Sequence, residues 1–157
     1  MTGRTIDELV IGDRAELTCS INADLVASFV TISGDHNPLH HDAEFAASTS
    51  FGEPIAPGIL TAAFISAVIG TELPGPGAVY LSQSLKFLRP VMVNDTITTR
   101  VEVTEVIPGR NRVCLRTECV NGRGEPVLTG EAWVMPAKAA QSRERRIEPA
   151  VALARAA

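Results

Sequence analysis

Residues 58–70, GILTAAFISAVIG, form the longest apolar stretch of this 157-residue chain. Within this stretch no residue is charged, and only Thr61 and Ser66 carry a hydroxyl. Pro57 stands directly before it, and proline is well tolerated at the first position of a helix. We therefore expect a helix that begins near Gly58. Because the segment is apolar almost all round, it is predicted to be buried on every side.

The chain after this helix is predicted to form strands. A connection rich in glycine and proline covers residues 70–77. Apolar and polar residues then alternate with the period of a strand in four segments, at residues 81–88, 97–104, 113–119 and about 126–136. Asn121–Gly124 has the composition of a hairpin turn. Consecutive strands joined by short turns favour an antiparallel sheet, whose inner face the apolar helix must cover.

The chain before the apolar helix is predicted to contain one strand and two helices. Residues 12–20 contain an alternation that is compatible with one strand. Apolar residues recur at helical spacing over about 23–33, where Asn22 is placed to cap the helix and Gly34 to end it. Asp42 can cap a further short helix, which contains residues 44–47.

One long apolar helix wrapped by an antiparallel sheet is the hot-dog architecture, in the α+β class. The length fits one domain with a single core, which we assign to residues 1–137. Residues 138–157 are rich in alanine and arginine and lack a long apolar pattern. This last segment is predicted to be a mobile tail or a frayed helix.

The bulk composition excludes several classes of protein. The net charge is −4, which argues against a general nucleic-acid binder. The longest apolar stretch is well short of the ~20 residues that span a bilayer, and no secretory signal is evident at the N-terminus. The three cysteines, Cys19, Cys114 and Cys119, fit neither a disulfide framework nor a zinc site. We expect free thiols and a soluble, cytoplasmic protein.

The segment GDHNPLHHD, residues 34–42, concentrates groups that can transfer protons. Asp35, His36 and His40 lie within it, and Pro38 prevents the preceding helix from continuing. Adding water to an α,β-unsaturated thioester needs a base, an acid and donors for the charge on the thioester oxygen. Asp35 and His40 can share the first two roles around one water, and the amide of Asn37 can position either of them. The sequence does not say which of the two is the base.

The polar residues of this segment, and the hydroxyl group in the apolar helix, also have purely structural interpretations. Asp and Asn before a proline make a good turn on chemistry alone. The adjacent histidines His40 and His41 could indicate a metal, but no second ligand cluster appears, so no metal is expected. The hydroxyl of Ser66 could simply bond the carbonyl four residues earlier. Gly58, in contrast, would offer a free backbone N–H at the positive end of the helix dipole.

The same segment resembles the Asp-x-Asn-Pro-x-His motif of the MaoC-like (R)-specific enoyl-CoA hydratases, which are hot-dog enzymes. The resemblance runs from about Asp7 to Met135 in the order of the family. It includes Phe45-Ala-Ala, the helix start PIAPGIL at 54–60, LPGPGAVYLSQSLKFLRPV at 73–91 and GEAWV at 130–134. It implies hydration of a trans-2-enoyl-CoA to an (R)-3-hydroxyacyl-CoA.

The resemblance also implies roles for particular residues. The catalytic pair of the family falls on Asp35 and His40, its backbone oxyanion donor on Gly58 and a pocket hydroxyl on Ser66; we add Asn37 to the predicted substrate site. The family usually has histidine immediately before the helix glycine, where this chain has Pro57. Any role of a histidine side chain at that position is therefore lost.

The resemblance further implies a homodimer with the acyl-CoA near its interface, which is reasonable because a small sheet leaves open strand edges. CoA is then part of the substrate, and no cofactor is expected. Five basic residues could meet its phosphates and are not ranked by sequence: Lys86, Arg89, Arg110, Arg112 and Arg116.

The alternatives are a hot-dog acyl-CoA thioesterase, a hydratase acting on acyl-carrier-protein thioesters and a non-catalytic acyl-CoA-binding protein. A thioesterase would need an acidic residue on the central helix, and residues 58–70 contain none.

Overall fold

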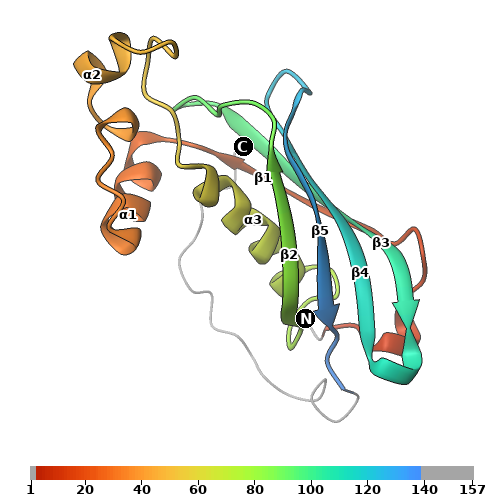
Figure 1. Cartoon of the computed structure of the whole chain (residues 1–157). Coiled ribbons are helices and arrows are strands. Elements are labelled where there is room, and N and C mark those ends of the chain that lie inside the picture. The colour runs from red at the N-terminus through yellow and green to blue at the C-terminus, as the bar shows by residue number, and fades with distance from the viewer. Residues whose placement is uncertain (1–2, 139–157) are drawn as a thin grey trace.

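The computed structural model describes residues 3–138 (Figure 1). Its strands are β1 (Arg14–Ser20), β2 (Val79–Phe87), β3 (Thr96–Ile107), β4 (Arg112–Val120) and β5 (Pro126–Met135). Its α-helices are α1 (Ala23–Ser33), α2 (Ala43–Ala47) and α3 (Gly58–Thr71), and three short 3-10 turns are η1 (Ile6–Glu8), η2 (Pro38–His40) and η3 (Pro108–Arg110). The predicted tail lies outside the described residues except for Lys138, so the domain boundary stays a prediction.

The five strands form one sheet in the order β1-β3-β4-β5-β2, and every neighbouring pair is antiparallel. The α3 helix contacts β1, β2, β3 and β4, and Figure 1 shows it lying along one side of the curved sheet. This arrangement confirms the predicted α+β hot-dog architecture. The predicted hairpin turn is also confirmed, because Gly124 has a φ of 77° and Asn121 Oδ1 accepts the backbone N–H of Arg123 at 3.1 Å.

The core lies between α3 and the inner face of the sheet. The α3 helix contributes its buried side chains at helical spacing: Leu60, Thr61, Phe64, Ile65, Val68 and Ile69. The sheet contributes residues such as Val103 and Leu115, which are fully buried in the same cluster. Burying a large aliphatic side chain stabilises a fold by about 1.5–3 kcal/mol, so this contact supplies much of the driving force for folding.

The prediction that the apolar helix is buried on every side is wrong for the single chain. The α3 helix exposes a stripe made of Gly58, Ile59, Ala63, Ser66 and Gly70. The side chain of Ile59 is 57% exposed. The physical reason is that the sheet covers only one side of the helix, and no second layer within residues 3–138 covers the other. The stripe is an apolar surface that this chain leaves open.

The predicted alternation of β2 is wrong at Leu81. The register of β2 against β5 shifts between Tyr80 and Ser82, which is a β-bulge, and Leu81 is exposed there. A bulge adds one residue to a strand and so reverses which side chains face inward beyond it. The alternation from Gln83 to Phe87 therefore cannot be extended back through Leu81.

The ends of α1 follow the prediction. Asn22 caps the helix by accepting the N–H of Leu25 at 2.9 Å, and Gly34 ends it with a φ of 74°.

The three cysteines are free, as expected, and they are buried. Burial raises the pKa of Cys119 to about 11, which keeps it an unreactive thiol. None of the helices in the described part of the chain is long and apolar enough to cross a membrane.

Thr61 is a weak point of the core. Its hydroxyl is buried and has no hydrogen-bond partner among residues 3–138, whereas Thr31 and Thr71 donate to the carbonyls four residues before them. Replacing such a hydroxyl by a methyl group of similar shape removes a desolvation penalty. We expect Thr61→Val to raise the free energy of unfolding by about 1 kcal/mol, measured by urea denaturation.

The matched control is Thr99→Val, because the buried hydroxyl of Thr99 does have a partner in Cys119 Sγ at 3.4 Å. That variant should not gain stability. A Thr61→Val protein that unfolds more easily than the wild type would contradict this account of the core.

Candidate active site

The loop after α1 is shaped by Asn37 and Pro38. Asn37 Oδ1 accepts the N–H of Leu39 at 3.1 Å and so caps the η2 turn that carries His40. The backbone N–H of Asn37 donates to Asp35 Oδ1 at 3.3 Å. Asn37 thus forms hydrogen bonds with residues on both sides of it in the motif, Asp35 and Leu39. Its predicted contact with substrate stays a prediction.

The ring of His40 has one defined orientation. It is buried, with 9% of its surface exposed, and its Nδ1 lies 2.7 Å from the carbonyl oxygen of Ile55. A carbonyl oxygen can only accept, so Nδ1 carries the proton of this hydrogen bond. The other nitrogen, Nε2, lies 3.5 Å from Asp35 Oδ2. With the Nδ1 proton used by Ile55, Nε2 is the nitrogen that faces a carboxylate that is 46% exposed and open to solvent.

The other polar residues of the loop have separate contacts. His41 Nε2 lies 3.4 Å from the carbonyl oxygen of His36, and both histidines are exposed. Asp42 Oδ1 accepts the N–H groups of Glu44 and Phe45, each at 3.0 Å, and so caps α2 as predicted. Of the three histidines, His40 is the one that is paired with a carboxylate.

The segment before α3 joins the His40 ring to the helix start. Ile55, whose carbonyl holds the ring, is three residues before Gly58, where α3 begins. Pro57 occupies the N-cap and not the first helical position, a small departure from the prediction. The N–H of Gly58 finds no hydrogen-bond acceptor among residues 3–138, as is usual for the first N–H groups of a helix. It remains free to donate to a ligand.

Glycine at position 58 allows the ring of Phe87 to lie close to the start of the helix. A Cβ built on Gly58 would lie 2.9 Å from Cε1 of Phe87. The two residues line a hollow of about 330 Å³, together with Ile55 and Thr61. A second hollow of about 440 Å³ is lined by His40 and His41, with Asp24 and Asn94. His40 thus lines the second hollow, and Ile55, whose carbonyl holds its ring, lines the first.

Ser66 lies apart from the loop in the single chain. It follows Gly58 by eight residues, which is about 12 Å along a helix axis, and it is exposed on the open stripe of α3. The structural interpretation of Ser66 does not hold, since no bond from its hydroxyl to the carbonyl of Ala62 is formed. Its predicted contact with substrate stays a prediction.

Ile55 and Phe87 belong to the site, and the sequence analysis did not select them. Ile55 acts through a backbone carbonyl, which no side-chain pattern can reveal. Phe87 was recognised only as a strand residue, and its proximity to Gly58 depends on how the strand end packs against α3. The nearby prolines Pro54 and Pro57 are the sole local signal, and prolines favour a loop without revealing which groups the loop contacts.

A family model, the MaoC like domain, matches residues 10–121. The chain belongs to the MaoC-like family. It is 48% identical over 128 residues to a 3-hydroxybutyryl-CoA dehydratase of Methylorubrum extorquens, a match that covers 82% of this chain and 81% of the relative. It is 44% identical over 129 residues to an (R)-specific enoyl-CoA hydratase of Rhodospirillum rubrum, which covers 82% of this chain and 89% of that protein.

A solved structure also matches this chain in three dimensions. The unliganded R-hydratase of Pseudomonas aeruginosa superposes with a TM-score of 0.86 and 41% identity, covering 97% of both chains. The family resemblance drawn from the sequence is therefore confirmed, and so is the hot-dog fold.

The roles of the two aspartates of the MaoC-like loop, Asp35 and Asp42, can be distinguished experimentally. Asp42→Ala removes a helix cap, which should lower the free energy of unfolding by about 1 kcal/mol. Because Asp42 does not contact His40, the variant should keep most of its catalytic rate below its unfolding temperature. Chemical denaturation combined with an activity assay checks both expectations. A variant with unchanged stability and abolished activity would place Asp42 in the chemistry and contradict its assignment as a cap.

Proposed function

We propose that this MaoC-like protein is an (R)-specific enoyl-CoA hydratase, a hydro-lyase that adds water to trans-2-enoyl-CoA and gives (R)-3-hydroxyacyl-CoA. The observation that carries the proposal is the orientation of His40. Its Nδ1–H is donated to Ile55, so Nε2 faces the carboxylate of Asp35 at 3.5 Å. The relatives named as hydratases and a dehydratase support the same reaction, which is reversible.

In the proposed mechanism a single water lies between Nε2 of His40 and Oδ2 of Asp35. The imidazole takes a proton from the water, and the water oxygen forms a bond to C3 of the enoyl group. The electron pair of the double bond moves through C2 to the thioester oxygen. Asp35 holds the remaining hydrogen of the water and stabilises the imidazolium. The imidazolium then returns its proton to C2, so that one water is added in total.

The developing charge on the thioester oxygen needs a donor. The free N–H of Gly58 is at the positive end of the α3 dipole and can serve as an oxyanion donor. The absence of a side chain at Gly58 lets the thioester approach. CoA is a carrier of the acyl group in this reaction, and the proposed chemistry uses no metal or cofactor.

The dyad is tested with crotonyl-CoA, by following the loss of enoyl-thioester absorbance in the wild type and in Asp35→Asn and His40→Gln. Removing a general acid or base should lower the rate by roughly 10²–10⁴. Circular dichroism should show both variants folded. Full activity in either folded variant would remove that residue from the mechanism. Release of free thiol without hydration would favour the thioesterase, and turnover of acyl-carrier-protein thioesters alone would reassign the substrate.

We also propose that the enzyme is a homodimer that pairs along the β2 edge. The other edge strand, β1, exposes charged residues such as Arg14 and Glu16, which discourage pairing. In contrast β2 exposes Val79 and Leu81. The part of the open α3 stripe beyond Gly58 lies on the inner side of the same sheet and would be covered by a second copy related by a two-fold axis.

The proposed interface predicts that a charged residue on β2 will change the mass of the protein in solution from that of a dimer to that of a monomer. Leu81→Asp should shift the protein from dimer to monomer in sedimentation equilibrium, because a charge would be buried at the interface. Ile11→Asp is the matched control, since Ile11 is 69% exposed and lies just before β1. A wild-type protein that sediments as a monomer, or a control that dissociates equally, would contradict the interface.

The proposed location is the cytoplasm. Three free, buried cysteines suit a reducing compartment.

A further inference from the structure

The basic residues of the chain differ in whether they already have an acidic partner. Five arginines within residues 3–138 form ion pairs: Arg4, Arg14, Arg100, Arg116 and Arg123. The remaining cations of the described chain have no carboxylate of residues 3–138 within ion-pair distance: Lys86, Arg89, Arg110, Arg112 and Lys138. A phosphate of the substrate would most readily be bound by a member of this second group.

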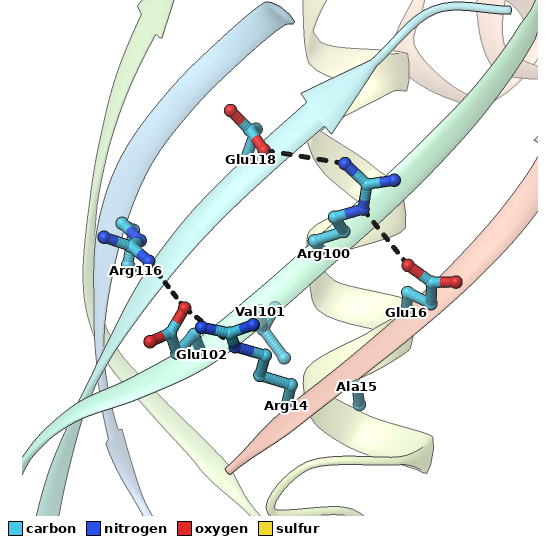
Figure 2. A pocket seen from close by; sticks show the side chains of 8 residues that line it. All are labelled: Arg14, Ala15, Glu16, Arg100, Val101, Glu102, Arg116 and Glu118. Atoms are coloured by element: carbon cyan, nitrogen blue, oxygen red, sulfur yellow. Dashed lines mark hydrogen bonds and ion pairs between the residues drawn. The ribbon is translucent and has the colours of Figure 1, made fainter. Parts of the chain in front are cut away.

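Arg116 forms an ion pair with Glu102 on the outer face of the sheet. Figure 2 shows it bonded to Glu102, which is shared with Arg14, while Arg100 bridges Glu16 and Glu118. These pairs form a two-row array of alternating charge across β1, β3 and β4, on the side of the sheet opposite α3. Arg116 is therefore both neutralised and remote from the helix start.

Arg110 and Arg112 are at the wrong end of the sheet. Arg112 is next to Val113, which pairs with Val134 of β5. The hollow beside Gly58 is instead lined by Leu128 of β5. Six residues of extended strand separate Leu128 from Val134, a distance of about 20 Å.

Lys86 is on the wrong face of its strand. Successive side chains of a strand point to opposite faces. Phe87 points inward, because its ring lies against Gly58. Lys86 therefore points to the outer face, away from the hollow.

Arg89 alone of this group lines the hollow that contains Gly58. Its Nη1 donates to the carbonyl oxygen of Pro126 at 2.7 Å, which anchors the side chain at the exposed rim. The carboxylate of Glu125, which follows the β4–β5 turn, is already bonded by Asn121 at 2.8 Å and Arg123 at 2.9 Å. The other N–H groups of Arg89 remain available, and a guanidinium is well suited to binding a phosphate through two of them.

We infer that Arg89 binds a phosphate group of the CoA moiety, and that the hollow between Gly58 and Arg89 receives the pantetheine arm. The inference rests on the proposed function, because it places the thioester at Gly58. The lining is mainly apolar, as suits the methylene-rich arm, and it is continuous with Ile55, which holds His40. Arg89 is thus a specificity residue that distinguishes CoA thioesters from thioesters without phosphate.

The test compares crotonyl-CoA, crotonyl-4′-phosphopantetheine and crotonyl-pantetheine as substrates of the wild type and Arg89→Gln. Losing a charge-assisted hydrogen bond should lower kcat/KM for crotonyl-CoA by roughly 10- to 100-fold, mainly through KM. The phosphate-free crotonyl-pantetheine should change less than about twofold. Arg89→Lys keeps the charge but not the paired donors and should fall between wild type and Arg89→Gln. The phosphopantetheine substrate identifies which phosphate is bound.

Lys86→Gln is the matched control, as it removes an unpaired cation three residues away and should leave KM for crotonyl-CoA unchanged. An equal loss on crotonyl-pantetheine would show that Arg89 only supports the structure and would overturn the inference. So would an unchanged KM for crotonyl-CoA in Arg89→Gln.

Calorimetric titration with free CoA separates this inference from the proposed function. If the wild type hydrates none of the three thioesters, the hydratase proposal fails, but weaker CoA binding by Arg89→Gln than by wild type would still support the phosphate contact. Equal affinity of both proteins for CoA, or no measurable binding by the wild type, would overturn it.

Discussion

Packing of α3 against the inner face of the sheet is the constraint on which the site depends. Side chains such as Phe64 and Ile65 fill the space that the strands of the antiparallel sheet enclose. Since this contact buries a large apolar area, the helix has one position relative to the sheet. Its first turn is then held at one place, and the loop that precedes it must reach back to that place. The free N–H of Gly58 and the carbonyl of Ile55 are both positioned in this way.

The candidate chemistry follows from that loop. Ile55 accepts the Nδ1–H of His40 and thereby selects which nitrogen is basic. Asn37 caps the turn below the ring and binds Asp35 through its backbone. None of these three hydrogen bonds involves His40 Nε2 or Asp35 Oδ2, yet together they define a gap of 3.5 Å between those two atoms. Preorganisation of this kind removes the cost of arranging the groups during the reaction.

The sequence predicts the elements of this fold well because their signals are local. The apolar stretch 58–70, the cap at Asn22 and the turn at Asn121–Gly124 each depend on neighbours in the chain, and all three were confirmed. The exposure of Ile59 was not predictable, because it depends on how many layers cover the helix. The bulge at Leu81 depends on the register with β5, which alternation within one strand does not contain.

The site was predicted only in part for the same reason. Asp35 and His40 belong to one short motif, so their proximity follows from the chain itself. The contribution of Ile55 is a backbone carbonyl fifteen residues from His40, and it leaves no trace in the pattern of side chains. Ranking the basic residues needed ion pairs across β1, β3 and β4, which form only in the folded sheet.

The most direct test of the proposed reaction is the fate of oxygen from water. The protein is incubated with crotonyl-CoA in ¹⁸O-labelled water, and the products are examined by mass spectrometry. The account predicts an intact CoA thioester with the label in the hydroxyl group at C3. Label in the carboxylate of a free acid, with release of unlabelled CoA thiol, would contradict it, because water would then have attacked the thioester carbon and not the double bond.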